Sequence, residues 1–229
     1  MSDELIEEID KANRGEVPSP FGRAEFFVKG TPVSVQSNKK TRNEYIESIR
    51  SQFNKLKYIL TGEIILNVTW LIPTKSRFET DAKADIDNCI KPIIDAFTGP
   101  DGLFVDDCQL RGLYICWRHI ETQDEKLVFE FEFHADDFSL KKELAFVRLE
   151  NALCTPVNLD WPIAVKHLWA DMLKSNQTSK NKLEKLGVTY PAVAGFLGSS
   201  RPFHVTRING FKILSLVEFI NINSIEVPK

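Results

Sequence analysis

The sequence lacks the features that would place it in a membrane or a secretory pathway. It has no run of about eighteen apolar residues, the length that a membrane-spanning helix needs. Its first ten residues, MSDELIEEID, are acidic and contain no apolar stretch like that of a secretory signal. We therefore expect a globular protein of the cytoplasm, and a composition of 43% hydrophobic and 27% charged residues is ordinary for that class.

Cysteine is also scarce. The four cysteines are Cys89, Cys108, Cys116 and Cys154, and no two of them have the C-x-x-C spacing of a zinc or redox site. Their number is too small for the disulfide scaffold of a secreted domain. We expect all four to be reduced and most of them to be buried.

The net charge of -3 is small, but the charge is unevenly distributed along the chain. Residues 1–20 and 81–140 are acidic, with net charges of -4 and -9, whereas residues 21–80 and 141–229 each carry +5. A polyanion needs only a local positive surface, so this alternation permits a nucleic-acid partner without proving one.

The hydrophobic pattern predicts an α+β domain over residues 23–137. Residues 1–22 are interpreted as an acidic, partly frayed arm that ends in the proline-rich VPSPFG. The order that follows is β-α-β-α-β-β, which predicts a mixed sheet packed on two helices. The expected strands cover residues 24–30, 62–73, 104–118 and 126–134, and the first helix covers residues 45–56.

The second helix has the clearest pattern. Ile90, Ile93, Ile94 and Phe97 recur at i, i+3, i+4 and i+7. Either Asp87 or Asn88 is expected to cap its start, Pro92 is expected close to the first turn, and Gly99 is expected to end it.

Residues 138–229 change in character and predict a mostly helical C-terminal extension. We expect a helix capped by Asp160, two short helices joined at Gly187, and a hairpin that turns at Asn209 and Gly210. A winged helix-turn-helix has this outline. A generic helical cap on the first domain fits the pattern equally well, and the sequence leaves both interpretations open.

The stretch from Asp81 to Gln109 holds seven aspartates. Asp85 and Asp87 are two residues apart in an extended segment, so their side chains leave the same face. Lys91 and Asp95 follow Asp87 at helical i+4 and i+8 positions. A tight turn then brings the next strand back, so either Asp106 or Asp107 is expected to face the same point as Asp85 and Asp87. Asp81 and Asp101 are interpreted as loop residues, and Asp95 as a helix-face partner of Lys91.

Clustered carboxylates without histidine or thiolate neighbours are the ligands of a hard ion such as Mg²⁺ or Mn²⁺. Such an ion hydrolyses phosphodiesters by activating water and neutralising charge on the phosphate. Lys91 could contact the phosphate, or it could form an ordinary helical salt bridge. An EF-hand counted from Asp85 is excluded, because Ile90 and Ala96 occupy its glycine and glutamate positions. A solvated acidic face is the remaining alternative.

The segment DIDNCIKPIIDAFTGPDGLFVDDCQL resembles the signature of the RusA family of Holliday junction resolvases. That signature runs D-x-D-N-x-x-K, then a helix, a glycine turn and a D-D pair before a strand. The resemblance extends more weakly over residues 24–134 and leaves residues 138–229 unexplained. By this resemblance the metal carboxylates are Asp85, Asp87 and Asp107, the essential cation is Lys91, and the supporting residues are Asn88 and Asp106, with Asp106 as the alternative third ligand.

The resemblance also implies an activity. It implies a Mg²⁺-dependent endodeoxyribonuclease, with Mn²⁺ able to substitute, that cuts four-way junctions or other branched DNA as a homodimer and leaves 5′-phosphate and 3′-hydroxyl ends. Two alternatives stay open. One is a nuclease of this type that the C-terminal extension directs to other DNA, and the other is a non-catalytic DNA-binding or regulatory protein.

Basic residues flank the acidic motif at positions where contacts to DNA phosphates would be useful. We expect them in the loop before the first helix and in the loop just ahead of the motif. A merely solubilising surface would have the same composition. The predicted DNA-binding residues are Lys39, Lys40, Arg42, Lys75 and Arg77.

Overall fold

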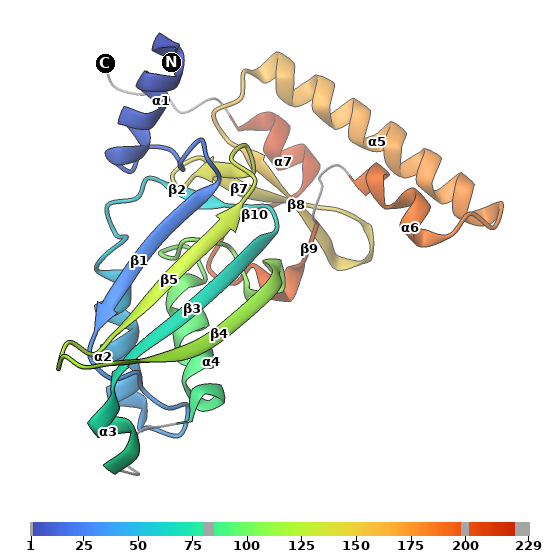
Figure 1. Cartoon of the computed structure of the whole chain (residues 1–229). Coiled ribbons are helices and arrows are strands. Elements are labelled where there is room, and N and C mark those ends of the chain that lie inside the picture. The colour runs from blue at the N-terminus through green and yellow to red at the C-terminus, as the bar shows by residue number, and fades with distance from the viewer. Residues whose placement is uncertain (1, 80–84, 198–201, 223–229) are drawn as a thin grey trace. The chain divides into compact units, whose positions relative to one another are not determined.

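The computed structural model describes residues 2–79, 85–197 and 202–222 (Figure 1). The chain divides into two compact units, residues 1–138 and 139–229. No helix of the described residues is long and apolar enough to cross a membrane. All four cysteines are free; Cys89 and Cys154 are buried, while Cys108 and Cys116 are partly exposed.

The first unit follows the predicted alternation of strands and helices. Its elements are α1 (Asp3–Asn13), β1 (Arg23–Lys29), α2 (Lys39–Arg50), β2 (Tyr58–Leu60), β3 (Ile64–Pro73), α3 (Thr74–Glu79), α4 (Ile86–Phe97), the 3₁₀ turn η1 (Asp107–Gln109), β4 (Leu110–Ile120) and β5 (Lys126–Phe133).

The central sheet of this unit is mixed, as predicted. Its strand order is β1-β5-β3-β4, in which β3 and β4 are parallel and the other neighbours are antiparallel. Period-two alternation buries one face of β3 throughout and the same face of β5 up to Phe131, and it leaves the other face partly exposed. A separate two-stranded sheet pairs β2 with β6 (Phe138–Leu140).

Helices α2 and α4 lie on the buried face of the sheet, behind it in Figure 1. Phe97, in the last turn of α4, is fully buried and holds the layers together. Its ring is stacked on Phe53 at 5.2 Å and meets Phe129 and Phe131 edge-on at 5.1 and 4.9 Å. The apolar face of α4 is therefore buried as its spacing predicted.

The ends of α4 only partly follow the prediction. The N-cap is Asp85 rather than Asp87 or Asn88, so the helix begins two or three residues earlier than expected, at Ile86. Pro92 accordingly lies inside the helix and not near its first turn. The expected stop is correct, since Gly99 has a φ of +93°, a conformation that glycine adopts without strain.

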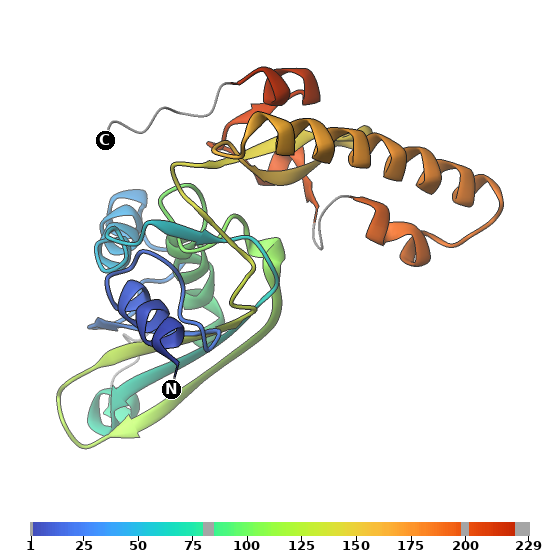
Figure 2. The same cartoon turned by 90° about the horizontal axis from the view of Figure 1, so that it is seen from above.

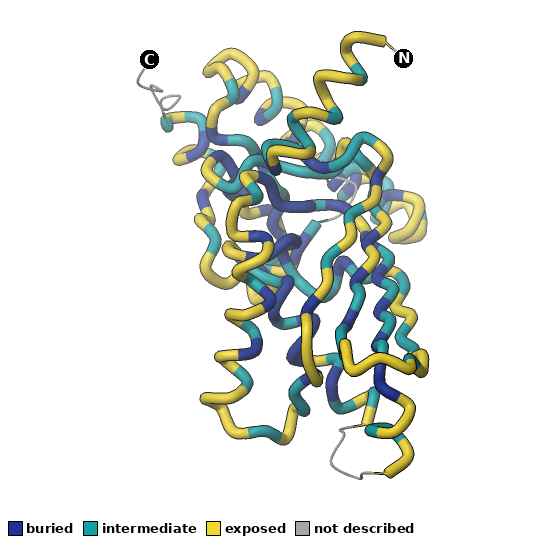
Figure 3. Tube along the Cα trace, turned by 60° about the vertical axis from the view of Figure 1, so that its left-hand side comes forward, coloured by how far each residue is buried: buried dark blue, intermediate teal, exposed yellow. Residues whose placement is uncertain are grey.

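Two segments of the first unit are more ordered than predicted. The acidic arm contains the regular helix α1, which Ser2 caps by accepting a hydrogen bond from the Leu5 amide at 3.3 Å. No residue of α1 is buried, and Figure 3 shows most of it as exposed. The expected loop ahead of the acidic motif begins as the short helix α3, while residues 80–84, including Asp81, lie outside the described residues.

The second unit combines short strands with helices. Its elements are β7 (Leu144–Arg148), η2 (Glu150–Ala152), β8 (Leu153–Asn158), α5 (Ile163–Lys185), α6 (Tyr190–Val193), η3 (Ala194–Leu197), β9 (Phe203–His204), η4 (Val205–Arg207), β10 (Ile213–Leu214) and α7 (Leu216–Asn221). The predicted helical character is present, and a four-stranded sheet that the sequence did not predict accompanies it, in the order β10-β7-β8-β9.

Several local predictions for this unit are wrong. The expected hairpin at Asn209 and Gly210 does not form, because β9 pairs with β8 and β10 pairs with β7 on the opposite edge of the sheet. The expected helices on the N-terminal side of Gly187 are one uninterrupted helix, α5 (Figure 2). Its N-cap is Pro162 instead of Asp160. Gly187 itself, with a φ of +84°, does separate α5 from α6.

The packing of Phe97 generates a prediction for stability. Phe97→Ala should lower the free energy of unfolding by about 3–5 kcal/mol, because it removes a fully buried ring and leaves a cavity between helix and sheet. The shift of the urea unfolding midpoint measures this change. Phe27→Ala is the matched control, since Phe27 is half exposed on β1 and should change stability by less than about 1 kcal/mol. Equal shifts for the two variants would contradict the anchoring role of Phe97.

Candidate active site

The first two aspartates of the motif lie at the start of α4. Asp85 is the N-cap residue but its side chain makes no cap hydrogen bond, and Asp87 lies in the first turn. Both side chains are exposed. The positive end of the helix dipole stabilises each carboxylate by about 0.3–1 kcal/mol. The helix dipole therefore partly offsets the repulsion between the carboxylates of Asp85 and Asp87.

Lys91 connects α4 to η1. Its Nζ lies 2.6 Å from Asp95 Oδ1 and 3.3 Å from Asp107 Oδ2. Asp95 is thus the helix-face partner that the sequence predicted. Partial burial would by itself lower the pKa of Lys91, but the hydrogen bonds and charges of Asp95 and Asp107 raise it above its ordinary value. Lys91 is therefore a cation at every physiological pH.

The ion pairs of Lys91 contribute little to stability. The side chains of Lys91, Asp95 and Asp107 are 55%, 43% and 34% exposed, and exposed pairs are worth at most about 1 kcal/mol. The ammonium group could therefore turn towards a bound anion at small energetic cost.

Asp106 and Asp107 have different environments, although they are adjacent. Asp106 caps η1, and its Oδ1 accepts a hydrogen bond from the Cys108 amide at 3.0 Å. Asp107 lies inside η1 and faces Lys91. Both precede β4 rather than forming its start, because the strand begins at Leu110. Of the two, Asp107 is the carboxylate that lies beside the motif lysine.

Gln109 fixes this turn, and sequence reasoning missed it. The side chain is fully buried and all of its hydrogen-bonding groups are used. Its Oε1 accepts from the amides of Val105 and Asp106 at 2.7 and 3.0 Å, and its Nε2 donates to the carbonyls of Leu60 and Gly62 at 3.0 and 2.7 Å. The D-x-x-Q spacing of a capping box was the available signal.

The chemistry of the donor set fits a hard cation, because the candidate ligands are all carboxylates. Cys89 does not add a thiolate: burial, together with the charges of Asp87 and Asp85, raises its pKa to about 11. Among the described residues, however, no group of three or more acidic, histidine or cysteine side chains is gathered closely enough to hold a metal ion. The ligands that suit the ion are present, but the described side chains do not form its coordination sphere.

Pro92 explains how a basic segment comes to lie beside the motif. Proline has no amide hydrogen, so the carbonyl of Asn88, four residues earlier, receives no helical hydrogen bond from position 92. The amide of Val35 donates to that carbonyl instead, at 2.8 Å. Arg42 then donates from Nη1 to the Val35 carbonyl at 3.0 Å. One of the predicted DNA-binding residues is therefore two hydrogen bonds away from the motif.

All five predicted DNA-binding residues lie on helices and not in the expected loops. Lys39, Lys40 and Arg42 form the first turn of α2, which begins after the N-cap Asn38. Lys75 and Arg77 lie on α3. These side chains also have protein partners, because Lys40 lies 3.9 Å from Glu44, Lys75 lies 3.7 Å from Glu79, and Arg77 stacks 4.2 Å above the ring of Trp117.

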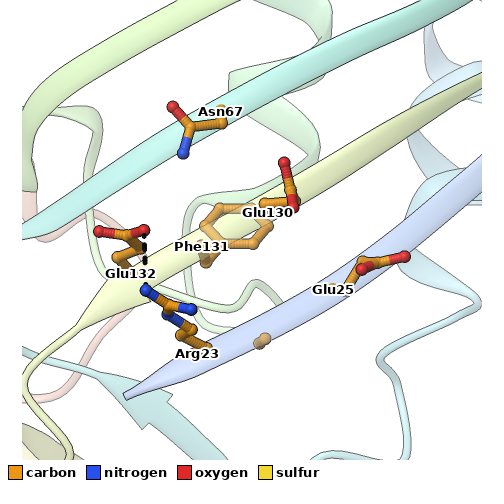
Figure 4. Close-up of a pocket in the computed structure, with 7 residues that line it drawn as sticks. Arg23, Glu25, Asn67, Glu130, Phe131 and Glu132 are labelled. Atoms are coloured by element: carbon orange, nitrogen blue, oxygen red, sulfur yellow. Dashed lines mark ion pairs between the residues drawn. The ribbon is translucent and has the colours of Figure 1, made fainter. Parts of the chain in front are cut away.

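A hollow of about 330 Å³ lies on the partly exposed face of the sheet and involves none of the predicted site residues (Figure 4). The charged and polar side chains that line it are Arg23, Glu25, Asn67, Glu130 and Glu132. Arg23 pairs with Glu132 at 3.7 Å, whereas Glu25 and Glu130 are cross-strand neighbours of like charge. This acidic surface is unsuited to a phosphate backbone.

Part of the chain matches the model of a known protein family. The family model described as Endodeoxyribonuclease RusA matches residues 17–127, which include every residue of the acidic motif. The second unit lies outside the match. A search of the curated proteins found no match to the chain.

The network of Gln109 generates a prediction. Gln109→Leu leaves the buried Val105 amide, the partly buried Asp106 amide and two buried carbonyls without their partner, so it should lower the free energy of unfolding by about 2–4 kcal/mol. The urea unfolding midpoint measures this loss. Gln123→Leu is the matched control, because Gln123 is exposed in the β4–β5 connection. If Gln109→Leu were as stable as Gln123→Leu, the buried amide would not be what holds the turn.

Proposed function

We propose that the chain, whose residues 17–127 match the family model described as Endodeoxyribonuclease RusA, is a divalent-metal-dependent endonuclease that cuts Holliday junctions or related branched DNA. The observation that carries the proposal is the bridge from Lys91 to Asp107, which joins the two halves of the motif across sixteen positions of sequence. We also propose a cytoplasmic location, because an enzyme that cuts DNA must have access to it.

The proposed roles follow from the chemistry of each side chain. Asp85, Asp87 and Asp107 would hold Mg²⁺, or Mn²⁺ in its place, with Asp106 as the alternative to Asp107. When bound, the ion supplies an activated water and neutralises charge on the phosphate. Lys91 would donate hydrogen bonds to a non-bridging oxygen of the scissile phosphate, since its raised pKa keeps it charged. Asp95 would orient Lys91 from the next helical turn.

The supporting residues act through position. Gln109 would hold the backbone of the Asp106–Asp107 turn against the end of β2 and the β2–β3 connection, so that the turn keeps its place when the charges near it change. Asn88 would tie the motif to the basic start of α2 through the hydrogen bond from Val35. Hydrolysis at such a site would leave 5′-phosphate and 3′-hydroxyl ends.

The oligomeric state follows from the proposed substrate. A four-way junction presents two equivalent strands, so a homodimer with two-fold symmetry would match it.

The second candidate function is a nuclease of the same type that acts on other DNA. The feature that favours it is the second unit, which has a buried core of its own around Val147, Leu214 and Phe219 and lies outside the family match.

Removing a motif carboxylate tests the chemistry. Asp87→Asn should lower the rate of Mg²⁺-dependent junction cleavage by roughly 100-fold or more, because the amide carries no negative charge for the ion. The measurement is cleavage of labelled four-way junction and linear duplex in Mg²⁺, Mn²⁺ or EDTA. Asp101→Asn is the matched control, since Asp101 is an exposed turn residue of the same acidic stretch.

Each outcome of this assay has a clear meaning. Cleavage of the junction alone, lost in Asp87→Asn and kept in Asp101→Asn, supports the proposed resolvase. Equal cleavage of duplex supports the second candidate. Binding without cleavage by the unaltered chain would contradict both and leave a non-catalytic DNA-binding protein.

Neutralising the start of α2 tests the DNA contacts. Lys39→Gln and Lys40→Gln should each weaken junction binding and reduce the slope of log affinity against log salt by about 1, because each removes one phosphate contact. Fluorescence anisotropy at several salt concentrations measures both quantities. Lys11→Gln on α1, where Lys11 pairs with Glu7 at 2.8 Å, is the control and should leave the slope unchanged.

A further inference from the structure

Strand β4 leaves one long edge of the central sheet unpaired by any described strand. It has eleven residues, pairs with β3 on one side only, and is the outermost strand of the sheet in Figure 1. At about 3.3 Å per residue this edge is roughly 36 Å long. Its outward-facing backbone groups form a template for another strand.

The side chains of this edge do not protect it from pairing. The five central residues of β4, Leu113 to Trp117, read LYICW and contain no charge or proline. Leu113, Tyr114 and Trp117 are 45%, 62% and 36% exposed. Sheet edges that stay unpaired usually carry charges, prolines or bulges in this position.

The opposite edge of the same sheet shows the contrast. Strand β1 reads RAEFFVK, and its charged residues Arg23, Glu25 and Lys29 are spread along it. Its exposed ring, Phe27, lies under the ammonium group of Lys126 at 5.6 Å. One edge of the sheet is therefore charged along its length, and the other is apolar at its centre.

We propose that the apolar edge of β4 pairs antiparallel with β4 of a second copy of the chain, so that the two sheets join across a two-fold axis. This inference names the interface of the homodimer suggested under the proposed function. A two-fold axis perpendicular to the sheet requires that the two edges be identical and self-complementary.

The sequence of β4 is self-complementary about Ile115. In a register centred there, Leu113 faces the partner subunit's Trp117, and Tyr114 faces the partner subunit's Cys116. Leu113 and Trp117 share one face of the strand, because they are the neighbours of Leu66 and Trp70 on β3. The apolar exposed side chains of the two copies therefore meet.

The charged residues of β4 also fit this register. Arg118 faces Gly112 of the partner subunit, which has no side chain to oppose it, and Arg111 faces the partner subunit's His119. No two arginines lie directly opposite one another, an arrangement that would destabilise the pairing. The charged residues lie towards the two ends of β4, so the apolar centre, Leu113 to Trp117, is the part of the edge that would drive association.

The pairing would also fix the position of the candidate sites. Strand β4 begins at Leu110, immediately after the turn that holds Asp106 and Asp107. A rigid continuous sheet would thus set the separation and orientation of two such turns, one in each subunit. Two cuts placed symmetrically in a branched DNA require a fixed geometry of this kind.

Molecular mass in solution tests the interface. The full chain of 26.2 kDa should run as a dimer in size-exclusion chromatography with light scattering. Leu113→Lys should weaken the dimer by roughly 100-fold, because it places a charge against an apolar centre. Phe27→Lys on β1 is the matched control and should stay dimeric. Thermal unfolding of both variants checks that each is folded.

A crosslink tests the register. Tyr114→Cys places a thiol opposite the partner subunit's Cys116, at a cross-strand separation that a disulfide can span. Mild oxidation should give a covalent dimer, and Tyr114→Cys combined with Cys116→Ser should give none. A covalent dimer in the second variant overturns the register.

Other outcomes overturn the interface itself. These are a monomeric wild type, or a folded Leu113→Lys variant that stays dimeric. A monomer in which Leu113→Lys weakens junction binding would assign this edge to DNA instead. A monomer that cleaves DNA would contradict the proposed interface but not the proposed nuclease activity. A dimer of this register that cleaves no DNA would support the interface and contradict the nuclease activity.

Discussion

The packing of α4 against the central sheet is the constraint on which the candidate site depends. Phe97 holds the C-terminal end of the helix between Phe53 of the neighbouring segment and two rings of β5. Arg50 of α2 reinforces the same end by donating to the carbonyls of Ala96, Asp95 and Thr98. With that end fixed, the chain must turn at Gly99 and return, and Asp107 arrives beside Lys91. The packing of the apolar face of α4 thus determines where its polar face, with Lys91, lies.

Crowding of aspartates in this stretch is tolerated because the carboxylates have separate surroundings. Asp106 is occupied with the cap of η1, and Asp95 and Asp107 share one ammonium group. Asp85 and Asp87 remain exposed to water at the positive end of a helix. No described carboxylate of the motif is buried without a partner, so the repulsion is spread over groups that water or a cation can screen.

The sequence predicted those elements whose pattern is local and periodic. Alternation identified β3 and β5, and helical spacing identified the buried face of α4. The N-cap of α4 was misplaced because Asp85, Asp87 and Asn88 are all good cap residues, and tertiary packing chose among them. Strands β7 and β8 were missed because they are short apolar runs joined at Asn151 and Ala152, which have positive φ without a glycine to mark the turn.

Long-range pairing accounts for the remaining differences. Asn209 and Gly210 do form a turn, as their local preference indicates, but the flanking two-residue strands each find a longer partner in β7 and β8. In the site, the spacing of Asp87, Lys91 and Asp95 predicted the pair with Asp95. It could not predict that Gln109 would be buried, because that burial depends on the carbonyls of Leu60 and Gly62, which lie more than forty positions away in the sequence.

The proline within α4 joins two segments that would otherwise have no backbone hydrogen bond between them at this point. A loop such as residues 31–37 has no ladder of its own and would ordinarily fluctuate faster than a helix. Its Val35 amide is held by a helical carbonyl, so this part of the loop is released only when it leaves Asn88 or when the first turn of α4 opens. Proline at position 92 therefore exchanges a hydrogen bond within the helix for one that ties the neighbouring loop to the first turn of α4.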